Sequence, residues 1–326
     1  MRELRRVLVT GGAGFVGLPL CERLLDLGAA VLSIDDLSTS APGAATHLTG
    51  RPGYQFLQHD NTEPVHPAWL RQPIDTVFHL ASPASPADYL RLPIHTLRTG
   101  ALGTATVLEI AERCGARMIL ASTSEVYGDP LQHPQQESYW GNVNPVGVRS
   151  VYDEAKRFAE ALCFAHHRAR GTDVGVARLF NTYGPRMRVH DGRMVPTFCR
   201  QALRGEAITV TGTGEQTRSL CFIDDTVSGL IALARSGHIG PVNIGNPNEL
   251  TVNHCAEVIR DLAGSDSVIV HLPAAPDDPQ RRCPDISTAR THLAWSPRVA
   301  YWDGLARTVA WFGAHLRKES ECASWA

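Results

Sequence analysis

The sequence has few of the features that mark membrane, secreted or nucleic-acid-binding proteins. No apolar run in its 326 residues approaches the roughly 18–20 that a transmembrane helix needs. The first apolar run, Val7–Thr10, is too short for a signal peptide. The formal net charge is only -2, which gives no general attraction to nucleic acid or to anionic lipid. We therefore expect a cytoplasmic protein without nucleic-acid or membrane partners.

Cysteine is present but shows no pattern of pairing or metal binding. No two cysteines form a Cys-x-x-Cys pair, and most lie inside apolar stretches, at positions 21, 114, 163, 199, 221, 255, 283 and 322. This distribution favours small buried side chains in a reducing compartment over disulfides. We expect no metal site.

Hydrophobic residues make up 43% of the chain, enough over this length for a full core and about two domains. In the first half, short apolar runs alternate with stretches of helical spacing, which predicts a doubly wound parallel sheet of the Rossmann type. The expected strands are 7–10, 30–35, 54–59, 76–80, 118–122 and 174–180, and the expected helices are 15–27, 97–114 and 151–168.

After residue 180 the pattern loosens, and Gly, Pro and short elements dominate. This composition favours a smaller C-terminal α/β substrate domain, with helices at 196–204, 224–236, 253–263 and 302–316. We therefore divide the chain into a Rossmann domain at 1–180 and a substrate domain at 181–326, with some exchange of strands and helices between them.

A glycine motif stands between the first expected strand and helix. Gly11, Gly14 and Gly17 allow a tight turn and bring the backbone close to a pyrophosphate at the helix N-terminus. Asp35 ends the second strand, where an acidic residue accepts hydrogen bonds from the adenosine ribose. Asp36 follows it, and two carboxylates would repel a 2′-phosphate. The expected cofactor is therefore NAD rather than NADP.

Further cofactor contacts are expected on the same edge of the sheet. Phe15 and Val16 belong to the glycine loop. After the third strand, Asp60 and Asn61 would meet the adenine. After the fourth strand, Leu80, Ala81 and Ser82 would lie on the pyrophosphate side.

Tyr152 and Lys156 form a Y-x-x-x-K pair in a helical stretch, so both lie on one helix face. A free tyrosine has a pKa near 10, and a nearby ammonium together with a cationic nicotinamide would favour its phenolate. Thr123, Ser124 and Glu125 follow the fifth strand, where ligands of open parallel sheets bind. We expect Thr123 to hold the substrate hydroxyl or share its proton with Tyr152, and Glu125 to add a carboxylate beside the sugar.

Five further segments complete the pattern: HLASPASP at 79–86, ASTSEVYGDP at 121–130, ESYWGNVNP at 137–145, FNTYGPRM at 180–187 and QTRS at 216–219. With these segments the sequence resembles the extended short-chain dehydrogenase/reductases that act on nucleotide sugars, and within them the UDP-glucuronate decarboxylases (UDP-xylose synthases). The resemblance runs from about residue 5 to residue 315 and is most specific between 121 and 145.

The resemblance implies roles for individual residues. Thr123, Tyr152 and Lys156 would form the hydride-transfer set, and Glu125 and Arg282 would flank the sugar carboxylate. The UDP-sugar would be held by Asn181 and Arg218, with Tyr89 and Arg98 touching the glucuronate or its phosphate. It also implies a homodimer, in which the helices at 97–114 and 151–168 pair with their copies as a four-helix bundle.

The implied reaction is decarboxylation of UDP-glucuronate to UDP-xylose through a 4-keto intermediate, with NAD reduced and reoxidised in the site. A nucleotide-sugar 4-epimerase shares the glycine loop and Tyr152–Lys156, but has no use for both Glu125 and Arg282 beside a carboxylate. A 4,6-dehydratase reads Thr-Asp-Glu where this chain has Thr123-Ser124-Glu125. Two other functions stay open: a decarboxylase that releases the 4-keto pentose, and a non-catalytic protein that senses NAD.

Overall fold

The protein is described by a computed structural model, which covers the backbone of residues 2–41, 43–66, 70, 72–274 and 280–323, and side chains up to residue 317 within these ranges. In that part of the chain no helix has the length and apolar character needed to span a membrane. The seven cysteines with described side chains are all free thiols.

A seven-stranded parallel sheet organises most of the chain, in the order β11-β6-β5-β4-β1-β2-β3. This is the predicted doubly wound Rossmann arrangement, and β1 and β4 meet where the strand order reverses. The strands are β1 Arg6–Thr10, β2 Ala30–Asp35, β3 Tyr54–Gln58, β4 Thr76–His79, β5 Arg117–Thr123, β6 Val174–Leu179 and β11 Val242–Ile244. The division at residue 180 stays a prediction, since β11 comes from beyond it.

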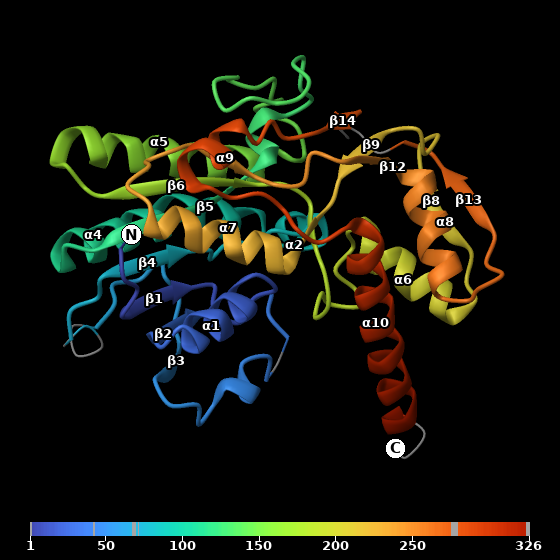
Figure 1. Ribbon diagram of the computed structural model, residues 1–326, viewed down its shortest axis with the longest axis horizontal. Helices are drawn as coiled ribbons and strands as arrows, with labels where there is room; N and C mark the ends of the chain where they lie inside the picture. Colours follow the sequence, from blue (N-terminus) through green and yellow to red (C-terminus); the bar gives the residue numbers. More distant parts are fainter. Residues whose placement is uncertain (1, 42, 67–69, 71, 275–279, 324–326) are drawn as a thin grey trace.

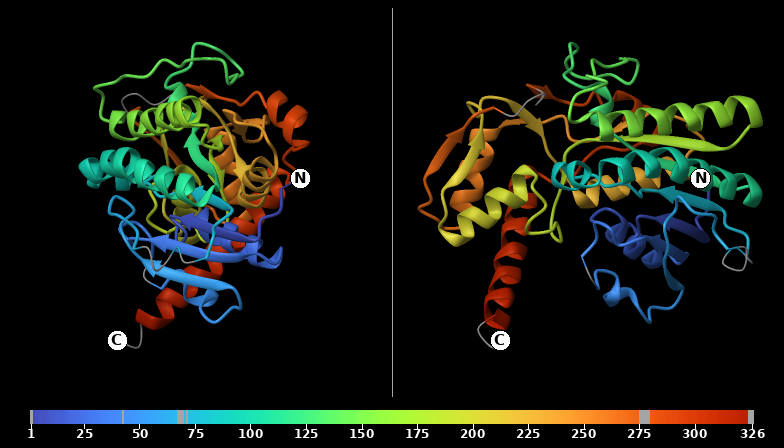
Figure 2. Two further views of the ribbon diagram at one scale, coloured as in Figure 1. Left: turned by 90° about the vertical axis from the view of Figure 1, so that its left-hand side faces the viewer. Right: turned by 180° about the vertical axis from the view of Figure 1, so that it is seen from behind.

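Both faces of the sheet are covered by helices (Figures 1 and 2). In β1, Val7 and Val9 join one hydrophobic cluster while Leu8 joins the other, as expected for alternating side chains of a strand buried on both faces. The first cluster includes α1 Gly17–Asp26, α7 Ile223–Arg235 and α9 Ser287–Leu293. The second includes α4 Thr104–Cys114 and α5 Ser150–Arg170.

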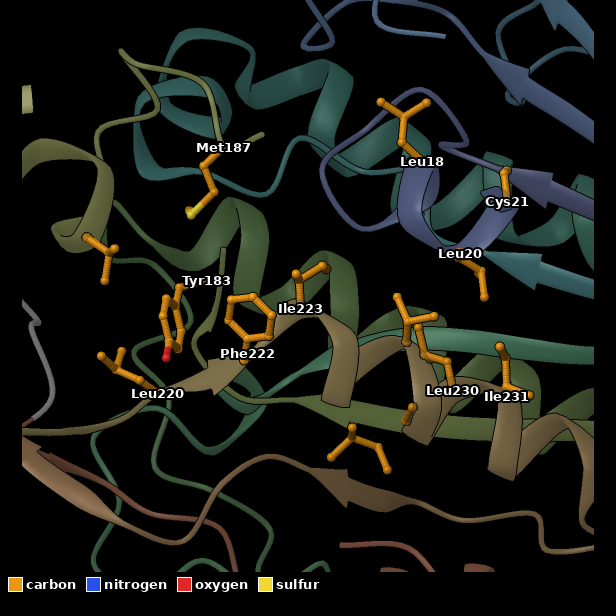
Figure 3. Close-up of a cluster of buried hydrophobic side chains, with 14 of the residues drawn as sticks. Leu18, Leu20, Cys21, Tyr183, Met187, Leu220, Phe222, Ile223, Leu230 and Ile231 are labelled. Atoms are coloured by element: carbon orange, nitrogen blue, oxygen red, sulfur yellow. The ribbon is translucent and has the colours of Figure 1, made fainter. Parts of the chain in front are cut away.

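The first cluster continues from the sheet toward the C-terminal part of the chain (Figure 3). Leu18 and Cys21 of α1 and Leu230 of α7 belong to the same buried core as Tyr183 and Phe222. These aromatic rings lie on two short parallel strands, β7 Thr182–Tyr183 and β10 Cys221–Phe222. The smaller C-terminal part is therefore joined to the sheet by continuous packing.

Among the described residues, that part also contains small sheets and helices, which lie to one side of the main sheet (Figure 1). β8 Ile208–Thr211 pairs with β13 Ile269–Leu272, and β9 Thr217–Ser219 lies between β12 Glu249–Thr251 and β14 Arg281–Arg282. The helices α6 Met194–Arg204, α8 Val252–Leu262 and α10 Tyr301–Ala323 pack together here.

The predicted helix at 97–114 is interrupted. It consists of α3 Pro93–Arg98, a π-helical turn at Thr99–Gly103 and then α4, and α2 Pro86–Arg91 precedes it. A Cβ at Gly100 would lie 2.7 Å from the Cβ of Ala155. Glycine at this position lets α5 approach closely, which places the start of α5 beside α2 and α3. Short 3-10 turns occur at Thr46–Leu48 and Ser124–Tyr127.

Candidate active site

Two neighbouring cavities open at the carboxyl ends of the central strands, where the sequence predicted binding. The larger, about 560 Å³, lies beyond β5 and β6 against α5, α6 and β9. The other follows the glycine loop and the end of β2. Val16, Leu80, Ser82 and Arg193 line both, so a ligand in one cavity can meet a ligand in the other.

The glycine loop fits a dinucleotide. A Cβ at Gly11 would lie 2.7 Å from the backbone nitrogen of Ala81, and one at Gly17 would lie 2.1 Å from the carbonyl oxygen of Gly11. Gly14 lines the cavity. At the N-terminus of α1, Val16 supplies no side-chain cap. Because the first N–H groups of a helix lack partners within it, this end suits a pyrophosphate.

Most predicted cofactor residues line this second cavity: Gly11, Gly14, Phe15, Val16, Gly17, Asp35, Asp36, Asn61, Leu80, Ala81 and Ser82. Asp35 accepts hydrogen bonds from the backbone of Ala13 and Leu37, at 3.0 and 2.9 Å. Burial raises the pKa of Asp35, and these bonds oppose the rise. Asp60 is not in the lining, because its carboxylate turns back to accept from the Thr62 N–H at 2.8 Å.

Tyr152, Lys156 and Thr123 converge in the larger cavity. The Lys156 Nζ lies 5.9 Å from the centre of the Tyr152 ring and donates to the Ala121 carbonyl at 2.9 Å. Burial lowers the pKa of Lys156 to about 8. Burial raises the pKa of Tyr152 and a hydrogen bond with Thr123 opposes this, so without ligands the phenol is protonated at neutral pH.

Glu125 lines the same cavity and is held between two arginines. Arg282 donates to both carboxylate oxygens, to Oε2 at 2.7 Å, and the Arg149 Nη2 lies 2.5 Å from Oε2. Burial alone would raise the pKa of Glu125, but the arginines outweigh it and lower that pKa to about 2. Arg282 is buried and lines neither cavity, so of these two cations only Arg149 reaches the cavity wall beside Glu125.

The predicted substrate residues divide into those that reach the cavity and one that does not. Tyr89, Ser124, Asn181 and Arg218 line it. The side-chain nitrogen of Asn181 is buried without a hydrogen-bond partner, as expected of a group that awaits a ligand. Arg98, which was expected to touch the glucuronate or its phosphate, is the exception. It is exposed at the end of α3 and lines neither cavity, because α3 turns this residue outward.

Sequence reasoning missed several arginines that line the cavities, among them Arg149 and Arg193. Arg149 precedes Tyr152 by three residues, and helical spacing puts 149, 152 and 156 on one face, so a signal was present. Arg193 lies between the cavities, 5.7 Å from the centre of the Phe15 ring, and pairs with Asp191. It comes from a loop segment whose sequence carries no local sign of its position.

A Rossmann sheet with an NAD site next to a Tyr–Lys–Thr constellation defines an NAD-dependent enzyme of the extended short-chain dehydrogenase/reductase class. The model of the NAD dependent epimerase/dehydratase family matches residues 7–245. UDP-glucuronic acid decarboxylase 1 of Danio rerio is 46% identical over 98% of this chain and 75% of its own length. UDP-glucuronic acid decarboxylase 6 of Arabidopsis thaliana is 49% identical over 92% of this chain and 86% of its own. The chain belongs to the UDP-glucuronic acid decarboxylases of that family.

Among solved structures, UDP-glucuronic acid 4-epimerase of Bacillus cereus, in complex with UDP-glucuronic acid and NAD, resembles this fold with a TM-score of 0.85. It is 27% identical and covers 95% of this chain and 99% of its own. The similarity agrees with the predicted fold and with NAD as the cofactor.

Proposed function

We propose that this chain decarboxylates UDP-glucuronate to UDP-xylose through a 4-keto intermediate, without net oxidation or reduction. The observation that carries the proposal is the pairing of Glu125, which lines the cavity together with Tyr152, Lys156 and Arg149, with both Arg149 and the buried Arg282. The names of the relatives agree with it.

Tyr152 is the base of the first step. As a phenolate it takes the proton of the C4 hydroxyl, while Thr123 holds that hydroxyl by a hydrogen bond. When bound, NAD supplies the hydride acceptor and later the hydride donor for C4, and a positive charge that favours the phenolate. Lys156 adds a second positive charge and reaches toward the nicotinamide ribose.

The carboxylate then lies β to the C4 ketone. As CO₂ leaves, the electron pair of the broken C5–C6 bond moves into the ketone, so the chemistry needs no metal ion. A proton returns to C5, and Tyr152 gives its proton back to the C4 oxygen when the ketone is reduced. The hydride and the hydroxyl proton removed from C4 in the first half are returned in the second, so the net change is the loss of CO₂ and the uptake of one proton at C5, with the electron pair of the broken bond kept by the sugar.

The arginines hold the substrate carboxylate by exchanging partners. Arg282 makes bidentate bonds to Glu125, and a sugar carboxylate offers the same two-oxygen geometry. When the substrate takes over an arginine, Glu125 loses a cation that keeps its pKa low. Burial then favours its protonated form, which makes Glu125 the candidate acid for C5.

The remaining site residues hold the two nucleotides. For the UDP-sugar we assign Tyr89, Ser124, Asn181 and Arg218, to which Arg193 adds a cation between the cavities. For NAD we assign Gly11, Gly14, Phe15, Val16, Gly17, Asp35, Asp36, Asn61, Leu80, Ala81 and Ser82. Asp60 does not line the dinucleotide cavity, so it is assigned no direct contact with NAD and is only the neighbour of Asn61.

The test is incubation with UDP-glucuronate and NAD. Decarboxylation yields one CO₂ and one UDP-pentose for each substrate consumed, and NADH does not accumulate. A UDP-hexuronate product without CO₂ would mean an epimerase, and this outcome matters because the Bacillus cereus epimerase was solved with UDP-glucuronic acid bound. CO₂ with a 4-keto pentose and stoichiometric NADH would mean that the last reduction fails.

A 4,6-dehydratase is the second candidate. It would have to expel a 6-hydroxyl, and Ser124 is buried with no carboxylate in the position that the family pattern gives to aspartate. UDP-glucose as sole substrate distinguishes the two, because only a dehydratase converts it to a 4-keto-6-deoxy sugar.

The chain is proposed to act as a cytoplasmic homodimer. Its free thiols suit a reducing compartment. Large apolar side chains are exposed along α2, α3, the π turn and α5, which pack side by side: Leu90, Ile94, Leu97, Leu102 and Phe158. A second copy of this face would cover them as a four-helix bundle.

A further inference from the structure

Three potential metal ligands meet on the side of the small sheet that carries Arg282. The His133 Nε2 lies 2.9 Å from the Glu249 Oε2, and both are within 4.8 Å of the Cys283 Sγ. They come from the loop after β5, from β12 and from the residue that follows β14. We propose that His133, Glu249 and Cys283 bind one Zn²⁺ ion and that this site fixes the strand carrying Arg282.

The ligand types fit zinc. Zn²⁺ prefers cysteine sulfur, histidine nitrogen and carboxylate oxygen in a tetrahedral arrangement, with bonds of about 2.3 Å to sulfur and about 2.0–2.2 Å to nitrogen and oxygen. Those bonds separate ligand atoms by about 3.3–3.6 Å. The His133–Glu249 pair must open slightly, and the sulfur must approach it. The exposed His133 side chain can make that adjustment, and water completes the fourth position.

The surroundings hold Glu249 and Cys283 in place. The Thr217 hydroxyl donates to the Glu249 Oε1 at 2.5 Å, which leaves Oε2 for a metal. The backbone of Cys283 makes two hydrogen bonds with Gln135, each of 2.8 Å: its N–H donates to the Gln135 Oε1, and its carbonyl accepts from the Gln135 N–H. The thiol donates to the Pro247 carbonyl at 3.3 Å.

The charges balance when the metal is bound. A thiolate and a carboxylate neutralise Zn²⁺, and the imidazole is neutral. Arg281 lies 3.9 Å from the Glu249 Oε2, but its side chain is largely exposed and can turn to solvent. Burial raises the pKa of the Cys283 thiol, so binding at neutral pH releases one proton, and nothing is oxidised or reduced.

The site is connected to the catalytic cavity through the chain. Arg282 binds Glu125 on the cavity side, whereas the next residue, Cys283, points to the other side of the strand, as alternation requires. β9 lies between β12 and β14 and itself carries Arg218, a cavity residue. A metal ion bound by both Glu249 and Cys283 therefore links the two edge strands of this sheet, β12 and β14.

The experiment uses the NAD-loaded enzyme. We expect one equivalent of Zn²⁺ in equilibrium dialysis, a higher Tm with Zn²⁺, and a thiolate-to-metal charge-transfer band with Co²⁺. Cys283→Ser and His133→Gln should each weaken Zn²⁺ binding at least about tenfold, since even the loss of a group that only supports a ligand costs 10–100-fold. Cys283→Ser should also remove the Co²⁺ band. Cys114 is a partly exposed free thiol of α4, and Cys114→Ser should change neither the Zn²⁺ affinity nor the Co²⁺ band.

Circular dichroism of the metal-free variants establishes that each is folded before binding is compared. Two results would overturn the proposal. One is the lack of stoichiometric binding to the wild-type chain. The other is binding that survives Cys283→Ser and His133→Gln but is lost in His95→Gln, which would place the ion at Asp36, Asp60 and His95 beside the dinucleotide cavity.

Discussion

The ring of Tyr89 lies parallel to that of Tyr152, with an angle of 8° between the planes and 5.3 Å between the ring centres. Tyr89 belongs to α2 and Tyr152 to α5, so this stack holds the proposed base against an element distant in sequence. Besides the UDP-sugar contact proposed for Tyr89, the stack gives this residue a proposed role in positioning Tyr152.

Two variants of Tyr89 should therefore distinguish the effect of ring stacking on kcat from the effect of the hydroxyl group on KM. Aromatic pairs contribute about 0.5–1.5 kcal/mol beyond area burial, so Tyr89→Ala should lower kcat about two- to tenfold. Tyr89→Phe keeps the stack and should retain kcat, while KM should rise because the hydroxyl proposed to contact the UDP-sugar is lost. Steady-state CO₂ release measures both constants, and an alanine variant with wild-type kcat would contradict the positioning role.

Tyr152→Phe removes the proton acceptor while preserving the stacked ring. General acid–base catalysis contributes about 10²–10⁴-fold, and a loss of that size in CO₂ release is expected. NAD content, measured after denaturation of the purified protein, should stay at the wild-type level. A variant that still forms the 4-ketone at the normal rate would exclude Tyr152 as the base.

Glu125 should make stability depend on acid pH. Its pKa is lowered from 4.5 to about 2 in the folded protein, so its ion pairs contribute fully above about pH 4.5 and are lost as pH falls toward 2. The linked free energy is on the order of 3 kcal/mol. Urea unfolding midpoints of wild type and Glu125→Gln should therefore differ most near neutral pH and converge in acid; a gap independent of pH would contradict this assignment.

The apolar face of α3 and α5 should control assembly. Ile94→Asp combined with Phe158→Asp places two charges in the proposed dimer contact and should convert the protein to a monomer in sedimentation. Val268→Asp alters an equally exposed apolar side chain of the C-terminal part and should leave the dimer intact. A wild-type monomer, or a double variant that remains dimeric, would rule out this interface.

Six of the seven strands of the sheet could be predicted because they are short runs rich in apolar residues, alternating with stretches of helical spacing; the short edge strand β11 was not predicted. Asp35 and Thr123 were expected at strand ends and lie there, on β2 and β5. The π turn at Thr99–Gly103 could not be predicted, because it follows from the tertiary contact of Gly100 with Ala155. Two-residue strands such as β14 carry no periodicity at all.

The residues of the candidate site likewise include some that local sequence predicts and others that only the fold brings together. Tyr152, Lys156 and the glycines follow local spacing rules, so they could be predicted from the sequence, and they line the two cavities. The Glu125–Arg282 contact joins residues 157 positions apart, so only the family resemblance suggested it. His133, Glu249 and Cys283 have no metal-binding spacing along the chain, and the cysteine pattern favoured buried thiols; only the fold brings the three together.

Arg149 provides the sharpest test of the carboxylate site, because nothing in the reaction other than the substrate carboxylate and Glu125 calls for it. Hydrogen bonds to charged groups contribute about 1.5–3 kcal/mol, so Arg149→Met should raise KM for UDP-glucuronate about tenfold or more. UDP alone lacks the carboxylate, and its inhibition constant should not change. Arg149→Lys keeps the charge and should recover part of the loss, whereas Arg168→Met, an exposed arginine of the same helix, should behave as wild type. Equal weakening of UDP and UDP-glucuronate by Arg149→Met would instead assign this arginine to the general shape of the cavity.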